Sequence, residues 1–248
     1  IKTIQTGSAV NALAWSPDGA TLATGEDNRS VALWKASGAA IKRETGWGAA
    51  VKCLAWRSDG NLLFMGTDGD GLHALQISNY KHYGHTTGQV VVNAIARSPD
   101  DALMALALNS GRVYFADLNK DWADVSSIAP EHGAALSIAW SPDKSLIVVG
   151  YADGKAVIYE ATSRKVLYLL KHNGAVNSVA WKPDASAAAP ILVSGCADGT
   201  VNIWNPGKNQ QTVYTGHTDA VLSVSWYQNT LASSSKDKSV ILWQPPSF

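Results

Sequence analysis

The stretch Val176–Trp181 reads VNSVAW, and close variants of it recur along the chain. The other copies are VNALAW at Val10–Trp15, VKCLAW at Val51–Trp56, VNAIAR at Val92–Arg97, LSIAW at Leu136–Trp140 and VLSVSW at Val221–Trp226. Their closing residues stand at positions 15, 56, 97, 140, 181 and 226, which gives steps of 41, 41, 43, 41 and 45 residues. A period of this length is typical of β-propeller blades, each a four-stranded sheet.

Each copy opens the same series of strands and turns. A turn with Pro, Asp or Gly follows the first strand, as in SPDG at Ser16–Gly19, and a short apolar strand comes next. A second turn, such as Asp198-Gly199, leads to a third strand that ends near an aromatic residue such as Trp204. A more variable fourth strand, for example Lys165–Leu170, leads to the next copy. Alternation with period two and frequent turns predict an all-β protein.

We therefore predict one domain over residues 1–248, a β-propeller of six four-stranded blades. The predicted repeats span 7–46, 47–85, 86–131, 132–171, 172–216 and 217–248 plus 1–6. The last repeat ends after its third strand at Trp243, whereas Ile1–Thr6 resembles a spare outer strand. Pairing of these two would close the ring and leave no exposed sheet edge there. The alternative is a larger or open propeller whose extra blade lies outside this chain or comes from a partner.

The units resemble WD40 repeats, and the resemblance covers essentially the whole chain. In that family a His before the first strand, a Ser or Thr in the second, an Asp in the next turn and a Trp in the third form a hydrogen-bonded set. Two units match fully, one with His172, Ser194, Asp198 and Trp204 and the other with His217, Ser233, Asp237 and Trp243. A buried indole N–H needs such an acceptor, and the Asp can fix the His tautomer.

The other four units depart from the pattern. Asn28 stands at the Asp position of the first unit, Trp47 at the His position of the second, Ala116 at the Trp position of the third and Val149 at the Ser position of the fourth. Packing can replace such networks, so these departures do not change the predicted fold. Trp47 and Trp122 are the two tryptophans that the repeat does not explain, and tryptophan is enriched in binding hot spots.

Composition narrows the classes of partner. Charged residues make up 16% of the chain, below the roughly 25% of an average protein, and 20 basic residues balance 20 acidic ones. We therefore expect no nucleic acid or membrane partner, and no stretch is apolar enough for a membrane helix. Cys53 and Cys196 are expected to be reduced and buried, as in a cytoplasmic protein, with a nuclear or cytoskeletal location as the alternative. The chain begins with Ile1 and not Met, as a piece of a longer protein would.

No sequence motif points to catalysis. The chain contains no G-x-S-x-G, P-loop, G-x-G-x-x-G or H-E-x-x-H pattern, and His82-x-x-His85 has no accompanying cluster of metal-ligating residues. We expect no enzyme activity, no cofactor and no metal.

The family resemblance instead implies a binding face, formed by the starts of the first strands and the turns before the third strands. We add Arg29, Trp47, Tyr151 and Asp219 to this face, and Trp122 from a separate loop insertion. The candidate partner-binding residues are then Asn11, Asp27, Arg29, Trp47, Lys52, Asn93, Asn109, Trp122, Tyr151, Asn177, Asp219 and Lys236. The face lacks an arginine cluster for phosphopeptides and a basic stripe for nucleic acid. The resemblance implies a non-catalytic scaffold or adaptor for other proteins in a multiprotein complex. The alternative is a structural subunit of a large assembly, with an open propeller completed by a partner, and an enzyme that uses the central channel ranks third.

Overall fold

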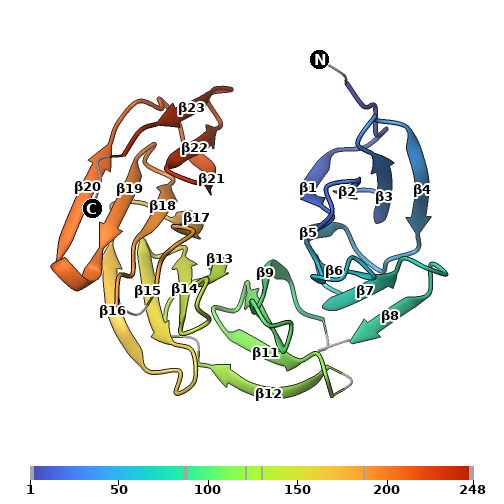
Figure 1. Ribbon diagram of the computed structural model, residues 1–248, viewed down its shortest axis with the longest axis horizontal. Coiled ribbons are helices and arrows are strands. Elements are labelled where there is room, and N and C mark those ends of the chain that lie inside the picture. The colour runs from blue at the N-terminus through green and yellow to red at the C-terminus, as the bar shows by residue number, and fades with distance from the viewer. Residues whose placement is uncertain (1–2, 86–88, 121, 130, 187, 246–248) are drawn as a thin grey trace.

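The computed structural model describes residues 3–85, 89–120, 122–129, 131–186 and 188–245. Six antiparallel sheets follow one another around an axis, so the predicted six-bladed propeller is confirmed (Figure 1). Helix is limited in the described residues to the short 3-10 turn η1, Pro206–Lys208. Each blade is a meander in which neighbouring strands along the chain pair with each other.

Five blades have four strands, and the described residues of the sixth form three. Blade 1 comprises β1 (Val10–Trp15), β2 (Thr21–Glu26), β3 (Ser30–Lys35) and β4 (Ala40–Thr45), and blade 2 comprises β5 (Val51–Trp56), β6 (Leu62–Thr67), β7 (Leu72–Gln76) and β8 (His82–His85). Blade 3 comprises β9 (Val92–Arg97), β10 (Leu103–Leu108), β11 (Val113–Asp117) and β12 (Ala123–Ile128), and blade 4 comprises β13 (Ala135–Trp140), β14 (Leu146–Tyr151), β15 (Lys155–Glu160) and β16 (Val166–Lys171). Blade 5 comprises β17 (Val176–Trp181), β18 (Leu192–Cys196), β19 (Val201–Asn205) and β20 (Gln210–Tyr214), and blade 6 comprises β21 (Val221–Tyr227), β22 (Thr230–Ser235) and β23 (Val240–Trp243).

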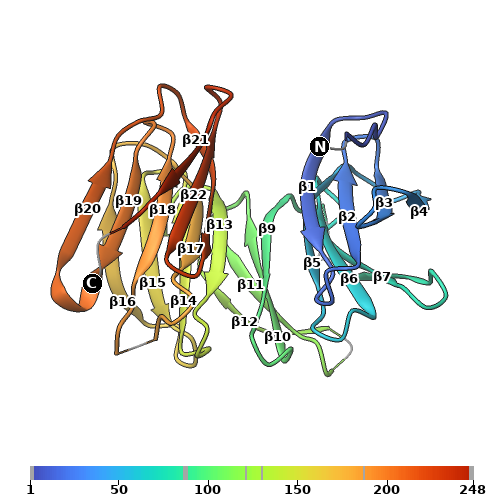
Figure 2. The same cartoon turned by 45° about the horizontal axis from the view of Figure 1, so that its top comes forward.

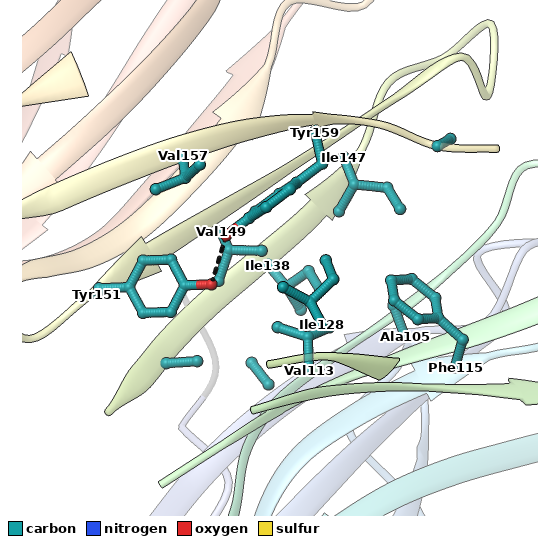
Figure 3. Close-up of a cluster of buried hydrophobic side chains, with 13 residues drawn as sticks. Ala105, Val113, Phe115, Ile128, Ile138, Ile147, Val149, Tyr151, Val157 and Tyr159 are labelled. Atoms are coloured by element: carbon teal, nitrogen blue, oxygen red, sulfur yellow. Dashed lines mark hydrogen bonds between the residues drawn. The ribbon is translucent and has the colours of Figure 1, made fainter. Parts of the chain in front are cut away.

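The hydrophobic core is divided into five clusters, and each cluster is shared by two successive blades. In the cluster of Figure 3, Val113 and Phe115 of blade 3 pack with Ile147, Val149 and Val157 of blade 4. A single blade cannot bury both of its faces, and stacking solves this because each face is covered by a neighbour. The five interfaces between the six blades therefore hold the fold together.

At four of the five interfaces, successive blades approach each other closely at a glycine in the second strand. A Cβ added to Gly25, Gly66, Gly150 or Gly195 would lie 2.6, 2.5, 2.8 and 2.6 Å from a Cγ1 of the valine that opens the next blade. Blade 3 has Ala107 at this position, and blade 4 opens with Ala135 instead of valine. The volume of the two side chains is thus matched at every interface, as close packing requires.

The predicted closure of the ring is not confirmed. The sheet of blade 6 has three strands, and the described residues 3–6 form no strand and no ladder with β23. The Thr6 carbonyl instead accepts a 2.9 Å hydrogen bond from Arg43 of blade 1. An opening separates β1 from β21, β22 and β23 (Figures 1 and 2). The structure is therefore an open arc of six blades.

Candidate functional site: the turn face

One face of the arc carries the turns between second and third strands. In every blade the backbone N–H that follows the second strand donates to the carbonyl just before the first strand, as from Asp27 to Ala9 (3.0 Å) and from Lys236 to Ala220 (3.0 Å). This bond fixes each turn beside the start of the first strand. We call the resulting surface the turn face.

The exposed candidates on the turn face are polar. Six of the predicted residues are exposed there: Asn11, Asp27, Arg29, Asn109, Asp219 and Lys236. Lys52, Asn93 and Asn177 are half-buried, and Lys52 Nζ lies 3.8 Å from Asp68 Oδ2. The turn face therefore offers hydrogen-bonding groups of both charges.

A hollow of about 740 Å³ lies on the turn face between blades 1 and 2. Its walls combine three carboxylates and one guanidinium with small residues: Asp27, Arg29, Gly48, Ala49, Ala50, Asp68, Gly69, Asp70 and Gln89. Asp27 Oδ1 accepts a 3.2 Å bond from Asn11, and Asp70 Oδ2 lies 3.1 Å from His73 Nε2. The hollow is thus acidic and large enough for side chains of a peptide. Asp68 and Asp70 were not among the residues selected from the sequence, because only their place beside the turn of blade 1 makes them part of one wall.

Three candidate asparagines differ in what they contact. Asn93 Nδ2 donates to the Ala135 carbonyl (2.9 Å) and Asn177 Nδ2 to the Val221 carbonyl (2.8 Å), each across to the next blade. Asn11 makes the same contact with Val51 (3.2 Å) besides its bond to Asp27. Their amides connect neighbouring blades, a structural role that the repeat pattern did not reveal.

Trp47 and Tyr151 lie beneath the turn face. Trp47 is 2% exposed and stacks on His82, with ring centroids 4.1 Å apart. Tyr151 is 1% exposed, and its hydroxyl lies 3.0 Å from that of Tyr159 (Figure 3). Burial is the main cause that raises the pKa of Tyr151. Both side chains pack the core, so we do not retain them as contact residues.

Trp122 lies away from the turn face, at the turn between β11 and β12. It is half-buried and meets Phe64 of blade 2 edge-on, at a centroid distance of 5.7 Å. It lines a separate pocket of about 690 Å³ with Arg57, His82 and Tyr83 among others. The structure therefore does not bring Trp122 together with the other candidates.

The hydrogen-bonded set of the family resemblance is complete in blade 6. His217 Nδ1 lies 2.9 Å from Asp237 Oδ2, and its Nε2 lies 2.7 Å from Ser233 Oγ. Trp243 Nε1 donates to the same Ser233 hydroxyl (2.8 Å). The hydrogen bond from Ser239, with those from the Thr218 N–H and His217, lowers the pKa of Asp237 below its usual range.

In blade 5 the set is incomplete. His172 Nε2 lies 2.7 Å from Ser194 Oγ, which accepts a 3.0 Å bond from Trp204 Nε1. Asp198 instead accepts bonds from the backbone and hydroxyl of Thr200, and His172 Nδ1 is buried without a hydrogen-bond partner. Asp198 therefore makes no hydrogen bond to His172, although the equivalent Asp237 accepts bonds from Ser239 through Oδ1 and still contacts His217 through Oδ2.

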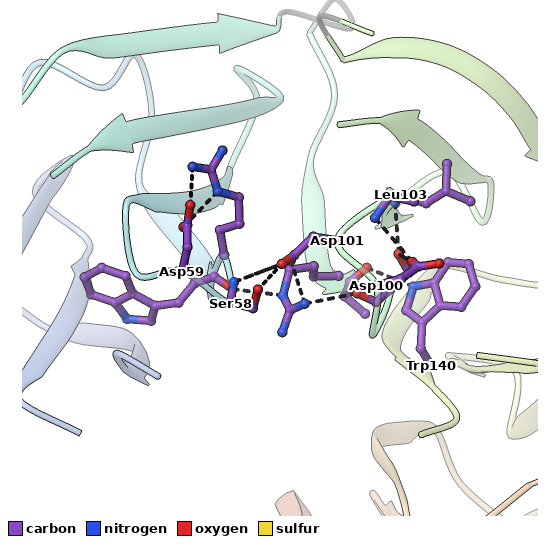
Figure 4. A network of polar contacts seen from close by, with 12 residues as sticks. Ser58, Asp59, Asp100, Asp101, Leu103 and Trp140 are labelled. Carbon is purple, nitrogen blue, oxygen red and sulfur yellow. Dashed lines mark hydrogen bonds and ion pairs between the residues drawn. The ribbon is translucent and has the colours of Figure 1, made fainter. Parts of the chain in front are cut away.

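The opposite face carries a polar network across blades 2, 3 and 4 (Figure 4). Asp101 accepts bonds from Ser58 of blade 2 and from Arg97 (2.6 Å), while Lys144 of blade 4 donates to Asp100 (2.8 Å). That ammonium and the Ser98 hydroxyl lower the pKa of Asp100 to about 2. The charged groups of this network pair with one another, which indicates a structural role.

No group of three His, Cys, Asp or Glu side chains stands close enough to hold a metal ion in the described part of the chain. Among the same residues, no helix is long and apolar enough to span a membrane. Cys53 and Cys196 are free thiols, and burial raises the pKa of each to about 12. Such thiols are largely protonated at neutral pH and so are poor nucleophiles.

Two family profiles match the chain. The profile described as "WD domain, G-beta repeat" matches residues 1–35, 164–205 and 208–244. The profile described as "Anaphase-promoting complex subunit 4 WD40 domain" matches residues 95–184. Together they reach into every blade except blade 2.

Two curated proteins are similar in sequence. The "Poly(A)+ RNA export protein" of Schizosaccharomyces pombe is 31% identical over 144 residues, which cover 50% of this chain and 41% of that protein. The "SIR4-interacting protein SIF2" of Saccharomyces cerevisiae is 25% identical over 246 residues, which cover 96% of this chain and 39% of that protein. The matched part of this chain thus spans about two fifths of the length of either relative.

Proposed function

Because the chain belongs to the WD40-repeat β-propeller family, we propose that it is a non-catalytic scaffold or adaptor for other proteins in a multiprotein complex. The observation that carries this proposal is the acidic hollow on the turn face between blades 1 and 2. The name of the budding-yeast relative describes a protein that interacts with another protein, which agrees with such a role.

The chemistry of the hollow selects the kind of partner. Asp27, Asp68 and Asp70 outnumber Arg29 in its wall, so a segment carrying lysine or arginine is favoured. Gly48, Ala49 and Ala50 leave space for long side chains. Exposed charge pairs contribute mainly to orientation and association rate, while apolar contacts around them supply affinity. The partner is therefore a basic peptide or loop of another protein.

The test compares charge reversals on the two faces. Proteins captured from cell extract by the wild-type chain are quantified by mass spectrometry beside Asp27→Lys and the control Asp184→Lys. Asp184 is 73% exposed and lies in the turn after β17, on the opposite face. We expect Asp27→Lys to lose partners that Asp184→Lys retains. Equal capture by all three folded proteins would contradict binding at the hollow.

A second role, that of a structural subunit in a large assembly, is favoured by the opening between blades 6 and 1 (Figure 1). Both roles are compatible with the expected cytoplasmic location. The RNA export named for the fission-yeast relative makes a nuclear location and an RNA-bound partner the competing possibilities. Fluorescence microscopy of the tagged chain distinguishes a cytoplasmic from a nuclear location. RNase treatment of the captured complexes shows whether capture of the partner depends on RNA.

A further inference from the structure

Blade 1 exposes an apolar face toward the opening. Val10 is 40%, Leu13 64% and Trp15 53% exposed. In the other five blades, the residue at the place of Val10 is always 0% exposed: Val51, Val92, Ala135, Val176 and Val221. They are covered because each packs on the second strand of the preceding blade, and blade 1 has no such neighbour among the described residues.

Blade 6 exposes the complementary face. Val240 and Leu242 of β23 are 68% and 69% exposed, whereas the register-equivalent Val201 and Ile203 of blade 5 are 0% exposed and packed against blade 6. The strands β1, β21, β22 and β23 contain no charged residue. Exposed apolar side chains gathered on facing sheets whose strands carry no charge mark an interaction site.

The indole of Trp15 makes no hydrogen bond to the described residues, whereas three of the four equivalent tryptophans do; the fourth, Trp226, has a buried Nε1 without a hydrogen-bond partner. Trp56, Trp140 and Trp181 each donate from Nε1 to a backbone carbonyl of the preceding blade, at 3.0, 3.0 and 3.1 Å. Arg97, which replaces the tryptophan in blade 3, donates from Nε to the Trp56 carbonyl at 3.0 Å. Whatever covers blade 1 is therefore expected to present a first-strand carbonyl to Trp15.

Direct docking of blade 6 on blade 1 is disfavoured by side-chain volume. Ser234 occupies the position of Gly195, opposite the residue that opens the next blade. Even a Cβ at that position would lie 2.6 Å from a valine Cγ1 at the usual separation, so Ser234 and Val10 cannot face each other in this geometry. Blade 3 shows the alternative solution, since Ala107 faces a blade that opens with Ala135.

We propose that the opening binds one further four-stranded blade supplied by a partner protein. Its first strand opens with alanine or glycine opposite Ser234, and its second strand carries glycine opposite Val10. Its two faces are apolar, and a carbonyl of its first strand accepts the Trp15 indole hydrogen. The inference rests on the second proposed role and is independent of the turn-face hollow.

The chain itself provides a matched pair of probes. Blade 4 has both required features, Ala135 and Gly150, whereas blade 5 has Val176 and Gly195. Residues 132–171 or residues 172–216 are joined after Phe248 through a flexible Gly/Ser linker, and the melting temperature and the binding of an apolar-surface dye are measured. We expect the extra copy of blade 4 to raise the melting temperature by about 5 °C or more and to reduce dye binding. The extra copy of blade 5 should do so only when Ser234→Gly is also present.

These fusions decide whether the opening accepts a blade. No rise with residues 132–171, or equal rises with both segments and unchanged Ser234, would overturn the proposal. Asp27→Lys should leave the rise unchanged, so failure here is distinguishable from failure at the turn face.

The source of the blade is tested with separate molecules. Sedimentation of the unmodified chain should show a monomer. A dimer that Leu242→Asp dissociates would instead assign the opening to a second copy of the chain and overturn the proposal. A soluble carrier protein that bears residues 132–171 should bind the unmodified chain, and this binding should be lost with Leu13→Asp. Stabilisation by the fused blade without binding of the carrier-borne blade would assign the place to a segment of the same polypeptide and overturn the partner assignment.

Discussion

The Nε1 atom of Trp56 lies 3.0 Å from the backbone oxygen of Ala14 and donates a hydrogen bond to it across the interface between blades 1 and 2. The closing residue of this first strand therefore stabilises the contact between its own blade and the preceding one. The neighbouring Trp15 has the same place in its own repeat, but it is 53% exposed at the end of the arc.

Trp56→Phe should lower the free energy of unfolding by about 1 kcal/mol, because it removes this bond between the blades while most of the apolar packing is kept. Trp15→Phe is the matched control and should change stability by less than about 0.5 kcal/mol. Urea denaturation followed by circular dichroism measures both. Equal losses would mean that the bond contributes nothing beyond ring packing.

Gly66→Ala should destabilise the protein by about 1–3 kcal/mol, since the new Cβ would lie 2.5 Å from Val92 Cγ1 and force the two blades apart. The double variant Gly66→Ala, Val92→Ala should recover part of this loss, because it reproduces the Ala107–Ala135 pair. A double-mutant cycle on unfolding free energies measures the coupling. Strictly additive effects would show that the two positions do not meet.

Arg43→Leu should cost about 3 kcal/mol, because Glu26 is 0% exposed and would keep a buried carboxylate without its guanidinium partner. Thr24 and Ser30 also donate to Glu26, and these bonds alone do not neutralise its charge. Lys42→Met breaks the partly exposed pair with Glu44 and should cost less than about 1 kcal/mol. Thermal and urea unfolding of both variants gives the comparison, and a small loss for Arg43→Leu would mean that water reaches Glu26.

His172 should make stability fall on mild acidification. Its burial lowers the pKa of the imidazole in the folded state, so the unfolded chain binds a proton more readily. The contribution of this residue is therefore fully present above about pH 6.5 and is lost as the pH falls toward the lower folded-state pKa. The pH dependence of unfolding between pH 7 and 5 should be shallower in His172→Gln, and NMR titration of the folded protein should place the His172 pKa below 6.5. An unchanged slope in the variant would contradict this assignment.

Most of the fold follows from the recurring first strand. The bounds predicted for Val10–Trp15, Val51–Trp56 and Val176–Trp181 coincide with β1, β5 and β17, because apolar alternation and turn residues act locally. Ring closure could not be predicted from this strand. Closure requires that Ser234 and Val10, at opposite ends of the chain, fit against each other. Repeat spacing alone carries no information about that contact.

The site was less predictable because burial of a single side chain depends on its neighbours in space. Trp47 was selected as an unexplained tryptophan, yet it fills the place of the family histidine and packs on His82. Asp198 and Asp237 have identical spacing to their tryptophans, but only Asp237 reaches its histidine. Asp27 and Arg29 are exposed as expected, since turn positions seldom carry buried charge.

The matched volumes between blades also restrict how two molecules can exchange parts while they fold. Repeat proteins are prone to domain swapping, because similar units of one chain compete for the same place in another. A fifth blade opening with Val176 would overlap Ala107 of blade 3, and a fourth blade opening with Ala135 would leave a void beside Gly25. Out-of-order swaps are therefore penalised at these junctions, which favours correct assembly of nearly identical blades at high protein concentration.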